Sequence, residues 1–539
     1  MTALPATPAP APSGAGARTK IFTGPRILAG DGTEPEALAV RSGWIVAAGT
    51  RHDLRSAFPK AEEVALDGAL VVPGFNDAHC HPSQAALARV RVDLNTLPNA
   101  GAVLSALRRQ ARRTPPGQWV VGQPLDERRV GVLDRDMLDQ VSDSHPVLVV
   151  HYSLHRAVAN SAGLAALGYR SPADAPPGGQ LGVRADGRLD GHLVERAWLD
   201  PWLPGTGASS IAPYGTPSAQ QAALKDVIAE LHACGITSFC DALVTPAEQE
   251  LYARTLAAGE LTARVGMLLW HSYADPERLP GDGPDPLRLR TVGVKMMLDG
   301  ALSGGTCLCR SPYPSATGTG NGLQILGDDE FTATVRAIDA AGGRVAVHAN
   351  GDQAVQTVLD VIESLPRSGT RHRIEHCSLI DDSLAGRIAR ARLITVPFGP
   401  FVTLHGEKLL DYYGDRVDHI CAHRTLRDAG IVVAGSSDYP LAPPDPLLAI
   451  RSLVTRTTAA GTTVGAGQRI GPQDAVDVYT RGSAAASDDE SVKGTLAVGR
   501  LADLAVLDTD LTAAEPDALS EIRVRSTWVG GECVYTSRR

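Results

Sequence analysis

Two histidines stand at alternate positions in the segment GFNDAHCHPS, residues 74–83, directly after the apolar run GALVVP. In a β-strand, residues i and i+2 point to the same face, so the side chains of His79 and His81 would lie together while Cys80 points away. Two imidazoles at the end of a strand could hold a metal ion, but the same pattern also arises by chance. The rest of the chain has to distinguish these two interpretations.

Further side chains of the same chemical kind lie in or after later apolar runs. Lys295 lies within VGVKMMLDG, His348 within GRVAVHANGD, His376 within HRIEHCS, and Asp438 ends GIVVAGSSD. Imidazole and carboxylate are good ligands for a divalent ion such as zinc, and they leave coordination positions open for water and substrate. A single buried histidine is more often a hydrogen-bonded core residue. The whole set, each at a strand and in one order, favours a metal site.

The elements that must position these residues are short apolar runs that alternate with helix-like segments. Seven such runs follow residue 235, and the run before His79 makes eight. Repeated βα units with buried strands predict a parallel sheet, and eight strands fit a (β/α)8 barrel of the TIM type. His348 and His376 are 28 residues apart, close to one βα unit, and His376 and Asp438 are 62 apart, close to two. Catalytic residues of such barrels lie at the carboxyl ends of the strands, so we expect one shared site.

The spacing also predicts how the chain is divided into parts. Residues 1–18 are rich in Pro, Ala and Gly and are predicted to be a disordered tail. Residues 19–70 and 490–539 contain short strands broken by glycines, and together they predict one small β-sandwich. The barrel takes residues 71–489, with a large insertion at about 84–215 after its first strand. The insertion would form a lid or pocket wall, or a stabilising decoration, and these remain alternatives.

Composition excludes several classes of function. The formal net charge of −9 argues against a nucleic-acid binder or an anionic-membrane binder. No apolar run reaches the roughly 18 residues of a membrane helix, and the N-terminus has no secretory pattern, so a cytoplasmic location is expected. Eight scattered cysteines form no disulfide framework. Cys307 and Cys309 stand close together, and we interpret them as reduced structural or pocket-lining thiols rather than metal ligands.

Several of these segments together carry a resemblance to a known family. They are PGFNDAHCH, GVKMMLDGALSGGT, VAVHANGDQAV, RIEHCS, GSSDYPLAPPDPL and KGTLAVGRLADLAVLD, with HYSLHRAVANSAGLAALG and PPGGQLGVRADG in the insertion. The chain resembles the amidohydrolase superfamily, and within it the amidohydrolase-3 branch that includes N-substituted formamide deformylase-like enzymes. The resemblance covers about residues 20–536.

The resemblance implies roles for the candidate residues. His79, His81 and Asp438 would bind a first metal ion, and His348 and His376 would bind a second ion or contact the substrate. Lys295 matches a position that many members carry as a carbamylated, metal-bridging lysine. The alternative is an unmodified Lys295 paired with Asp299 or with a substrate carboxylate.

The chain also departs from the pattern of its branch. Cys240 stands where relatives often have histidine, Asn350 replaces a usual aliphatic residue, and the CLC segment that contains Cys307 and Cys309 is unusual. These positions weaken any transfer of substrate identity.

The expected function is hydrolysis of a C–N bond in a small-molecule amide, with N-formyl or N-acyl amines as the leading class and one or two divalent ions, zinc first, as cofactor. Asp438 would take a proton from the attacking water and deliver it to the leaving nitrogen, and His348 or His376 would stabilise the oxyanion. Cyclic-amide opening and decarboxylation remain alternatives. Deamination is disfavoured because the position where deaminases of the superfamily typically carry a glutamate is Gly351 here. A catalytically inactive binding relative and a homo-oligomeric assembly are also left open.

Three further expectations concern residues near the site. Asp352 would either orient a histidine or cap the following helix. His151, Tyr152 and His155 of the insertion would either reach the pocket or lie on the surface. The glycine-rich segment at 317–322 is interpreted as a loop near the fourth strand rather than a nucleotide-binding loop.

Overall fold

The computed structural model of the chain describes residues 18–24, 26–203, 215–276, 283–315, 318–366 and 369–537. The predicted disordered tail therefore lies outside the described residues, apart from Arg18. Within these ranges, no helix combines the length and the apolar character that crossing a membrane requires.

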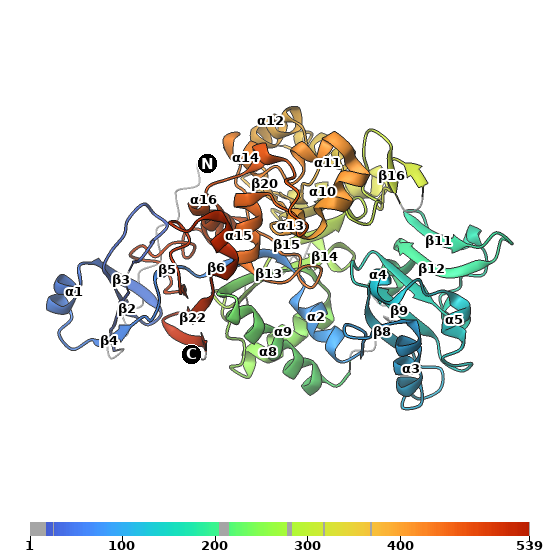
Figure 1. Ribbon diagram of the computed structural model, residues 1–539, viewed down its shortest axis with the longest axis horizontal. Coiled ribbons are helices and arrows are strands. Elements are labelled where there is room, and N and C mark those ends of the chain that lie inside the picture. The colour runs from blue at the N-terminus through green and yellow to red at the C-terminus, as the bar shows by residue number, and fades with distance from the viewer. Residues whose placement is uncertain are drawn as a thin grey trace.

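Seven parallel strands form one continuous sheet at the centre of the molecule, in the order β20-β19-β18-β15-β14-β13-β6 (Figure 1). Their bounds are β6 (Phe75–Cys80), β13 (Ile236–Val244), β14 (Arg264–Trp270), β15 (Leu289–Met297), β18 (Val345–Ala349), β19 (Arg373–His376) and β20 (Ile394–Val396). Every residue of β6, β13, β18, β19 and β20 is buried, as expected for parallel strands that are covered on both faces.

Residues 431–438 close this sheet into a barrel. Thr395 of β20 and Val433 form a parallel bridge, and the backbone N–H of Asp438 donates to the carbonyl oxygen of His79 at 2.9 Å. This eighth segment therefore lies between β20 and β6, and the predicted parallel (β/α)8 barrel is confirmed.

Helices follow most of the barrel strands and pack on the outside of the sheet (Figure 1). In α11, for example, Ala354, Val355, Val358, Leu359 and Ile362 form a buried stripe at helical spacing. The helices of this part of the chain are α2 (Pro82–Arg89), α8 (Pro217–Ala233), α9 (Pro246–Ala257), α10 (Asp328–Ala340), α11 (Asp352–Glu363), α12 (Asp382–Ala391), α13 (Phe401–Tyr413), α14 (His423–Asp428), α15 (Pro446–Thr455), α16 (Pro472–Asp477) and α17 (Ser483–Ala486).

The segment between α2 and α8 has a sheet and core of its own. Its strands run in the order β11-β12-β10-β9-β8-β7. They are β7 (Val92–Asp93), β8 (Val120–Leu125), β9 (Val147–His151), β10 (Arg156–Ala159), β11 (Gly179–Val183) and β12 (Leu189–Glu195). The helices are α3 (Ala100–Ala111), α4 (Glu127–Val130), α5 (Arg135–Asp139), α6 (Ser161–Ala166) and α7 (Arg196–Trp202). One apolar cluster of this segment includes the barrel residues Leu243 and Met297, so the two parts share a core at their junction.

Strands from both ends of the chain form two further sheets at one side of the barrel (Figure 1). One sheet has the order β3-β2-β1-β4, and the other the order β23-β22-β21-β5. Their bounds are β1 (Lys20–Thr23), β2 (Ala37–Arg41), β3 (Trp44–Gly49), β4 (Glu62–Ala65), β5 (Leu70–Pro73), β21 (Leu504–Leu507), β22 (Val524–Val529) and β23 (Glu532–Thr536), with α1 (Arg51–Ala57) beside the first sheet. The rings of Phe22 and Trp528 meet edge to face between them, with centroids 5.1 Å apart.

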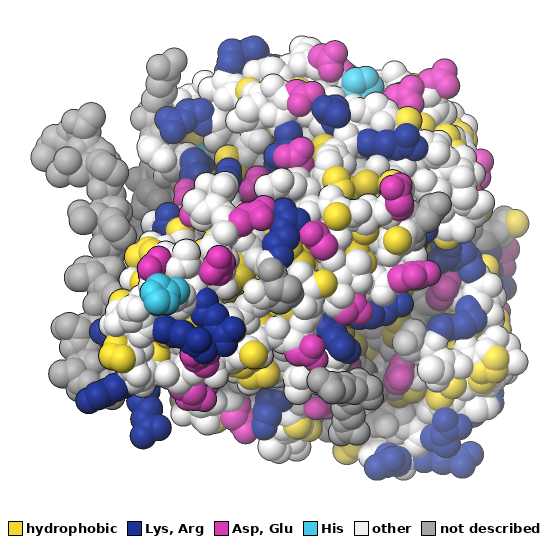
Figure 2. Space-filling view, turned by 60° about the vertical axis from the view of Figure 1, so that its left-hand side comes forward, with side chains coloured by type: hydrophobic (Ala, Val, Ile, Leu, Met, Phe, Trp, Pro, Cys, Tyr) yellow, Lys and Arg dark blue, Asp and Glu magenta, His cyan; other side chains and the backbone are white. Residues whose placement is uncertain are grey.

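The surface carries charges of both signs. Figure 2 shows lysine and arginine side chains interspersed with aspartate and glutamate side chains over the face that it presents. This mixed pattern is typical of a solvated surface rather than of a nucleic-acid footprint.

Candidate active site

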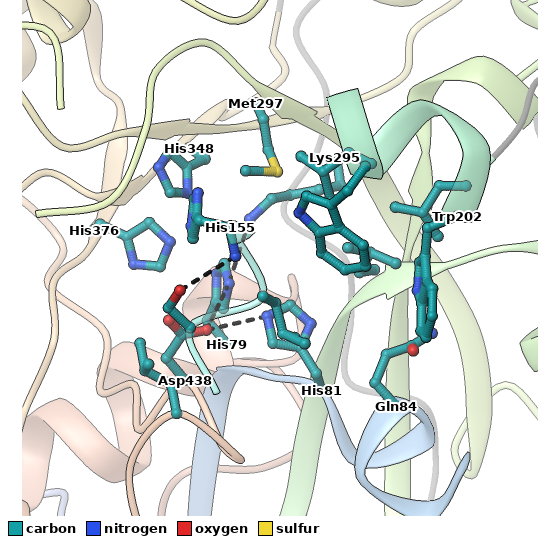
Figure 3. A pocket seen from close by; sticks show the side chains of 17 residues that line it. His79, His81, Gln84, His155, Trp202, Lys295, Met297, His348, His376 and Asp438 are labelled. Carbon is teal, nitrogen blue, oxygen red and sulfur yellow. Dashed lines mark hydrogen bonds and ion pairs between the residues drawn. The ribbon is translucent and has the colours of Figure 1, made fainter. Parts of the chain in front are cut away.

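Three potential ligands converge at the carboxyl ends of the barrel strands. His79 lies near the end of β6, His376 ends β19, and Asp438 ends the eighth segment. One nitrogen or oxygen of each lies within 4.8 Å of the others, and all three residues are buried (Figure 3). His376 and Asp438 have positive φ angles of 70° and 57°, which is uncommon for residues other than glycine. Backbone in this conformation clusters at functional sites, where the surrounding structure enforces it.

His79 is oriented by an ion pair that the sequence analysis did not single out. Its Nδ1 contacts Oε2 of Glu375, and Arg373 holds the same carboxylate with Nε–Oε1 and Nη2–Oε2 distances of 2.7 and 2.8 Å. All three side chains are fully buried. A carboxylate that accepts from Nδ1 leaves Nε2 as the lone-pair nitrogen, which is the arrangement found in metal-ligating histidines. The spacing of Arg373 and Glu375, two apart on one buried strand, was the available sequence signal.

His81 reaches the cluster through Asp438. Its Nε2 lies 3.0 Å from Oδ1 of Asp438, and Nε2 of His79 lies 3.5 Å from the same oxygen. Nδ1 of His81 is buried without a hydrogen-bond partner among the described residues. Asp438 is thus the carboxylate shared by the two histidines that opened the sequence analysis.

Lys295, on β15, also points to this cluster. Its Nζ lies 3.3 Å from Nε2 of His79. Burial lowers the pKa of Lys295 to about 8, so a sizeable fraction of the amine is neutral near physiological pH. Asp299 is engaged elsewhere, because its carboxylate accepts the backbone N–H groups of Leu308, Asn350 and Gly351, each at 2.9 Å. The structure therefore brings Lys295 to His79 rather than to Asp299.

His348 lies beside the cluster rather than within it. Its ring centroid is 4.5 Å from that of His376, while its Nε2 lies 3.1 Å from the carbonyl oxygen of Gly300 and 2.9 Å from Nδ2 of Asn350. His376 stacks on Phe398 with centroids 4.2 Å apart, and its Nδ1 is buried without a hydrogen-bond partner in the described chain. Burial holds the pKa values of His79, His348 and His376 well below their usual range. All three are therefore neutral imidazoles, the form that binds metal ions.

A cavity opens in front of these residues. The barrel supplies the histidines, Lys295 and Asp438, and the insertion supplies a wall that includes Trp198 and Trp202. His155 of the insertion also lines the cavity, whereas His151 and Tyr152 are not part of its lining. Nδ1 of His155 is 2.8 Å from Oε2 of the buried Glu195. Of the three insertion residues proposed from the sequence, the structure brings one to the site.

Other candidates from the sequence lie away from the ligand cluster. The sulfurs of Cys307 and Cys309 are 3.7 Å apart, both thiols are free and buried, and neither lines the cavity. Asp352 is the first residue of α11, but the capping position is Gly351 and no side chain caps this helix, so the predicted capping role is wrong. The Asp352 carboxylate instead accepts the N–H of Arg310 at 2.9 Å and links that loop to the start of α11. Cys240 is buried 3.8 Å from Nη1 of Arg373. Residues 318–320 of the glycine-rich segment form a short strand, β17 (Gly318–Gly320), paired with β16 (Tyr313–Ser315).

Comparison with known proteins agrees with this architecture. The "Putative amidohydrolase YtcJ" of Bacillus subtilis (strain 168) is 30% identical over 523 residues, covering 94% of this chain and 97% of its own. The "N-substituted formamide deformylase" of Arthrobacter pascens is 29% identical over 527 residues, covering 93% and 95%. A solved structure of an uncharacterized metal-dependent hydrolase from Pyrococcus horikoshii superposes with a TM-score of 0.72 at 23% identity, covering 93% of this chain and 99% of that one. The model of the amidohydrolase family matches residues 62–535, and the chain therefore belongs to the amidohydrolase family.

Proposed function

We propose that this chain is a metal-dependent hydrolase that cleaves the C–N bond of a small amide other than a peptide. The observation that carries the proposal is the buried cluster of His79, His376 and Asp438, whose ligand atoms lie within 4.8 Å of one another. Membership of the amidohydrolase family supports a hydrolase in general. The narrower class, N-formyl or N-acyl amines, is supported by the name of one relative at 29% identity.

The side chains at the cluster fit a divalent metal ion. His79 presents Nε2 because Glu375 engages its Nδ1, and His376 has a buried Nδ1 that no other group of the described residues satisfies. Such a buried, unpaired nitrogen costs free energy unless a ligand takes it. Neutral imidazoles with one carboxylate favour zinc among the common ions. His79, His81, His376 and Asp438 would hold the ion, with His348 beside them for a second ion or for substrate.

The residues around the cluster would carry out the proton transfers. A divalent ion bound here would lower the pKa of water toward 7 and polarise the scissile carbonyl. Asp438 would accept a proton on a carboxylate oxygen from the attacking water and deliver it to the leaving nitrogen. His348, which lines the same cavity outside the ligand cluster, would stabilise negative charge on the carbonyl oxygen.

Lys295 would act as a carbamate. Its neutral amine would attack carbon dioxide, forming an N–C bond and releasing one proton, and the product would be a carboxylate-like ligand beside His79. The lowered pKa of Lys295, about 8, supports this step because only the uncharged amine is nucleophilic.

The experiment that tests the proposal measures metal and turnover together. The chain would be purified without added metal and incubated with zinc or manganese and bicarbonate. Metal would then be counted by elemental analysis, and hydrolysis of N-substituted formamides followed by amine release. We expect about one or two ions per chain, strongly reduced in His79→Ala and retained in His52→Ala, a control histidine on the surface helix α1. A wild-type chain that stays free of metal after this incubation contradicts the proposal and favours an inactive binding relative.

A deaminase is a weaker candidate because of the backbone around Gly351. A Cβ at this position would lie 1.9 Å from the carbonyl oxygen of Leu308, so the glutamate that deaminases of this superfamily carry there cannot be accommodated without moving the loop. Opening of a cyclic amide and decarboxylation remain alternative reactions for the same site. A cytoplasmic location and a homo-oligomeric state stay predictions.

A further inference from the structure

The cavity wall supplied by the insertion differs in chemistry from the wall supplied by the barrel. Helix α7 places Trp198 and Trp202 four residues apart, hence on one side of the helix, with ring centroids 5.1 Å apart. Leu199 and Leu203 of the same segment also line the cavity. In Figure 3, Trp202 and His376 lie on opposite sides of the group of side chains drawn. We call the part of the cavity beside Trp198, Trp202, Leu199 and Leu203 the tryptophan compartment.

The four side chains that define the tryptophan compartment are apolar apart from the indole N–H groups. Among the described residues, the lining residues between positions 84 and 215 also include the polar groups Gln84, Ser153 and His155, but no carboxylate, ammonium or guanidinium group. The barrel residues Leu243 and Met297 add further apolar surface and pack in the same cluster as both tryptophans. A charged substituent placed here would lose its hydration without gaining a counter-ion, which is costly. The compartment therefore favours a neutral, apolar group.

One polar atom in this wall lacks a partner. Nε1 of Trp198 is buried, its residue is 1% exposed, and it makes no hydrogen bond within the described structure. Buried indole N–H groups normally find an acceptor, and leaving one unpaired costs free energy. Trp198 lines the cavity, so a molecule bound there could supply the acceptor that no described residue provides.

The wall is also held in place. Oε2 of Glu195, the residue before α7, lies 2.8 Å from Nδ1 of His155, and Oε1 accepts from Oγ1 of Thr306 in the barrel at 2.9 Å. The Arg91 guanidinium lies 4.3 Å from the centroid of Trp202. Glu195 is fully buried and ties the start of α7 to the barrel, so the tryptophans form a preformed surface.

From these observations we infer that the tryptophan compartment is a substrate subsite for a neutral aryl or branched alkyl substituent, with Trp198 Nε1 donating a hydrogen bond to an acceptor on the substrate. The inference rests on the proposed amide hydrolysis and adds the substrate class. Small amides without such a substituent, and amides with a charge at its far end, are poor substrates.

The first test compares kcat/KM within matched series on the metal-loaded enzyme. N-methyl-, N-butyl- and N-benzylformamide extend the amine side, while N-methylacetamide and N-methylphenylacetamide extend the acyl side. We expect kcat/KM to rise about 30-fold or more from the smallest to the largest apolar substituent in at least one series. A carboxylate at the para position of the better aryl substrate should lower kcat/KM about 10-fold or more, whereas a para-methyl group should not lower it. Equal kcat/KM throughout both series overturns the inference.

The second test assigns the effect to the two tryptophans. Trp202→Leu should lower kcat/KM for the aryl substrate about 10-fold while leaving the value for the smallest substrate within about 2-fold. Trp198→Phe keeps an aromatic ring but removes the N–H group. It should lower kcat/KM for the aryl substrate about 5-fold. Trp119→Phe is the matched control, because Trp119 lies in the same insertion and does not line the cavity. Equal losses with the small and the aryl substrate would overturn the assignment.

A third test separates this inference from the proposed function. Binding of benzyl alcohol and of propan-1-ol to the metal-free chain would be measured by calorimetry. Benzyl alcohol should bind about 10-fold more tightly, and Trp202→Leu should abolish the difference. If no amide is hydrolysed but benzyl alcohol binds in this way, the subsite stands and the proposed reaction fails. If small amides are hydrolysed and the two alcohols bind equally, the subsite fails and the reaction stands.

Discussion

At the scale of single residues, the arrangement around His79 depends on Glu375. The Glu375 carboxylate contacts Nδ1 of His79 on one side and the Arg373 guanidinium on the other. All three side chains are buried in the barrel. The pair thereby fixes which imidazole nitrogen faces the cavity. Partners of this kind typically contribute 10–100-fold to metal affinity.

We therefore predict that Glu375→Gln weakens metal binding by about 10–100-fold, because an amide no longer holds the Nδ1 proton of His79 as a carboxylate does. The measurement is a zinc titration in competition with a chelator, with circular dichroism as the check of folding. Glu363→Gln makes the same chemical change on the outside of α11, where Glu363 pairs with Arg387, and should leave affinity unchanged. Equal zinc affinities for wild type and Glu375→Gln would contradict this role.

His423 provides a pH prediction away from the cluster. It is fully buried, Nδ1 donates to the carbonyl oxygen of Cys421 at 2.8 Å, and burial lowers its pKa to about 3. Between this value and the unfolded pKa of 6.5, the unfolded chain binds the proton and the folded chain does not, so stability falls as the pH drops below 6.5.

The expected contribution is about 1.4 kcal/mol per pH unit below 6.5. It would be measured by urea denaturation of wild type and His423→Asn between pH 5 and pH 8. The difference between the two stabilities should shrink or reverse toward pH 5. A difference that is constant with pH would show that His423 takes up its proton in the folded state.

At the scale of elements, Asp299 ties the loop after β15 to the end of β18. Its two oxygens accept the N–H groups of Leu308, Asn350 and Gly351. His348 ends up against Gly300 in this loop, through a hydrogen bond of 3.1 Å to its carbonyl oxygen. One side chain thus sets both the loop and the position of a site histidine.

We predict that Asp299→Asn destabilises the fold by about 1.5–3 kcal/mol, because the new NH₂ group faces a backbone donor and leaves it unpaired. Turnover should fall with stability, since His348 loses its fixed position. Urea denaturation gives the first quantity and amide hydrolysis the second. Asp352→Asn, in the first turn of α11, is the control and should cost less than about 1 kcal/mol. A stability loss no larger than that of the control would contradict the role of Asp299 in connecting the loop after β15 to the end of β18.

The sequence predicted the barrel elements well because buried parallel strands are continuous apolar runs, and their spacing matches βα units. It also predicted which strand ends carry His79, His81, His348, His376 and Asp438. It could not predict the positive φ angles of His376 and Asp438, which are imposed by neighbouring strands. Glu375 was missed because its role depends on a contact with β6, 296 residues earlier in the chain.

The insertion was less predictable for a similar reason. Its strands β7, β10 and β11 span five residues or fewer, and their pairing is decided by neighbours rather than by local pattern. The place of Trp198 and Trp202 in the cavity wall could not be predicted either, since two tryptophans at helical spacing are equally expected in a core.

At the scale of the whole molecule, the barrel and the C-terminal sheet are joined by a buried ion pair. Arg264 begins β14, and Asp503 directly precedes β21; their atoms are 2.6 Å apart, and both side chains are less than 10% exposed. Asp503 also accepts the N–H of Gly530 at 2.7 Å, so it connects three segments.

We predict that Asp503→Ala destabilises the chain by about 3–5 kcal/mol, because Arg264 is left as an uncompensated buried charge. The double variant Arg264→Met, Asp503→Leu should recover part of the loss, since it removes both charges. Thermal or urea unfolding of the three chains measures this. A double variant no more stable than Asp503→Ala would mean that the Gly530 contact, rather than the ion pair, carries the effect.

The pairing of β5 with β21 has a consequence for how the protein is made. Leu70–Pro73 pairs with Leu504–Leu507, so β5 has no partner on this edge until residues 504–507 have left the ribosome. At about 5–20 residues per second, this delay is roughly 20–90 s. During that time the apolar edge of β5 is exposed to other nascent chains and to chaperones. Synthesis rate and chaperone supply should therefore affect the yield of this protein in cells.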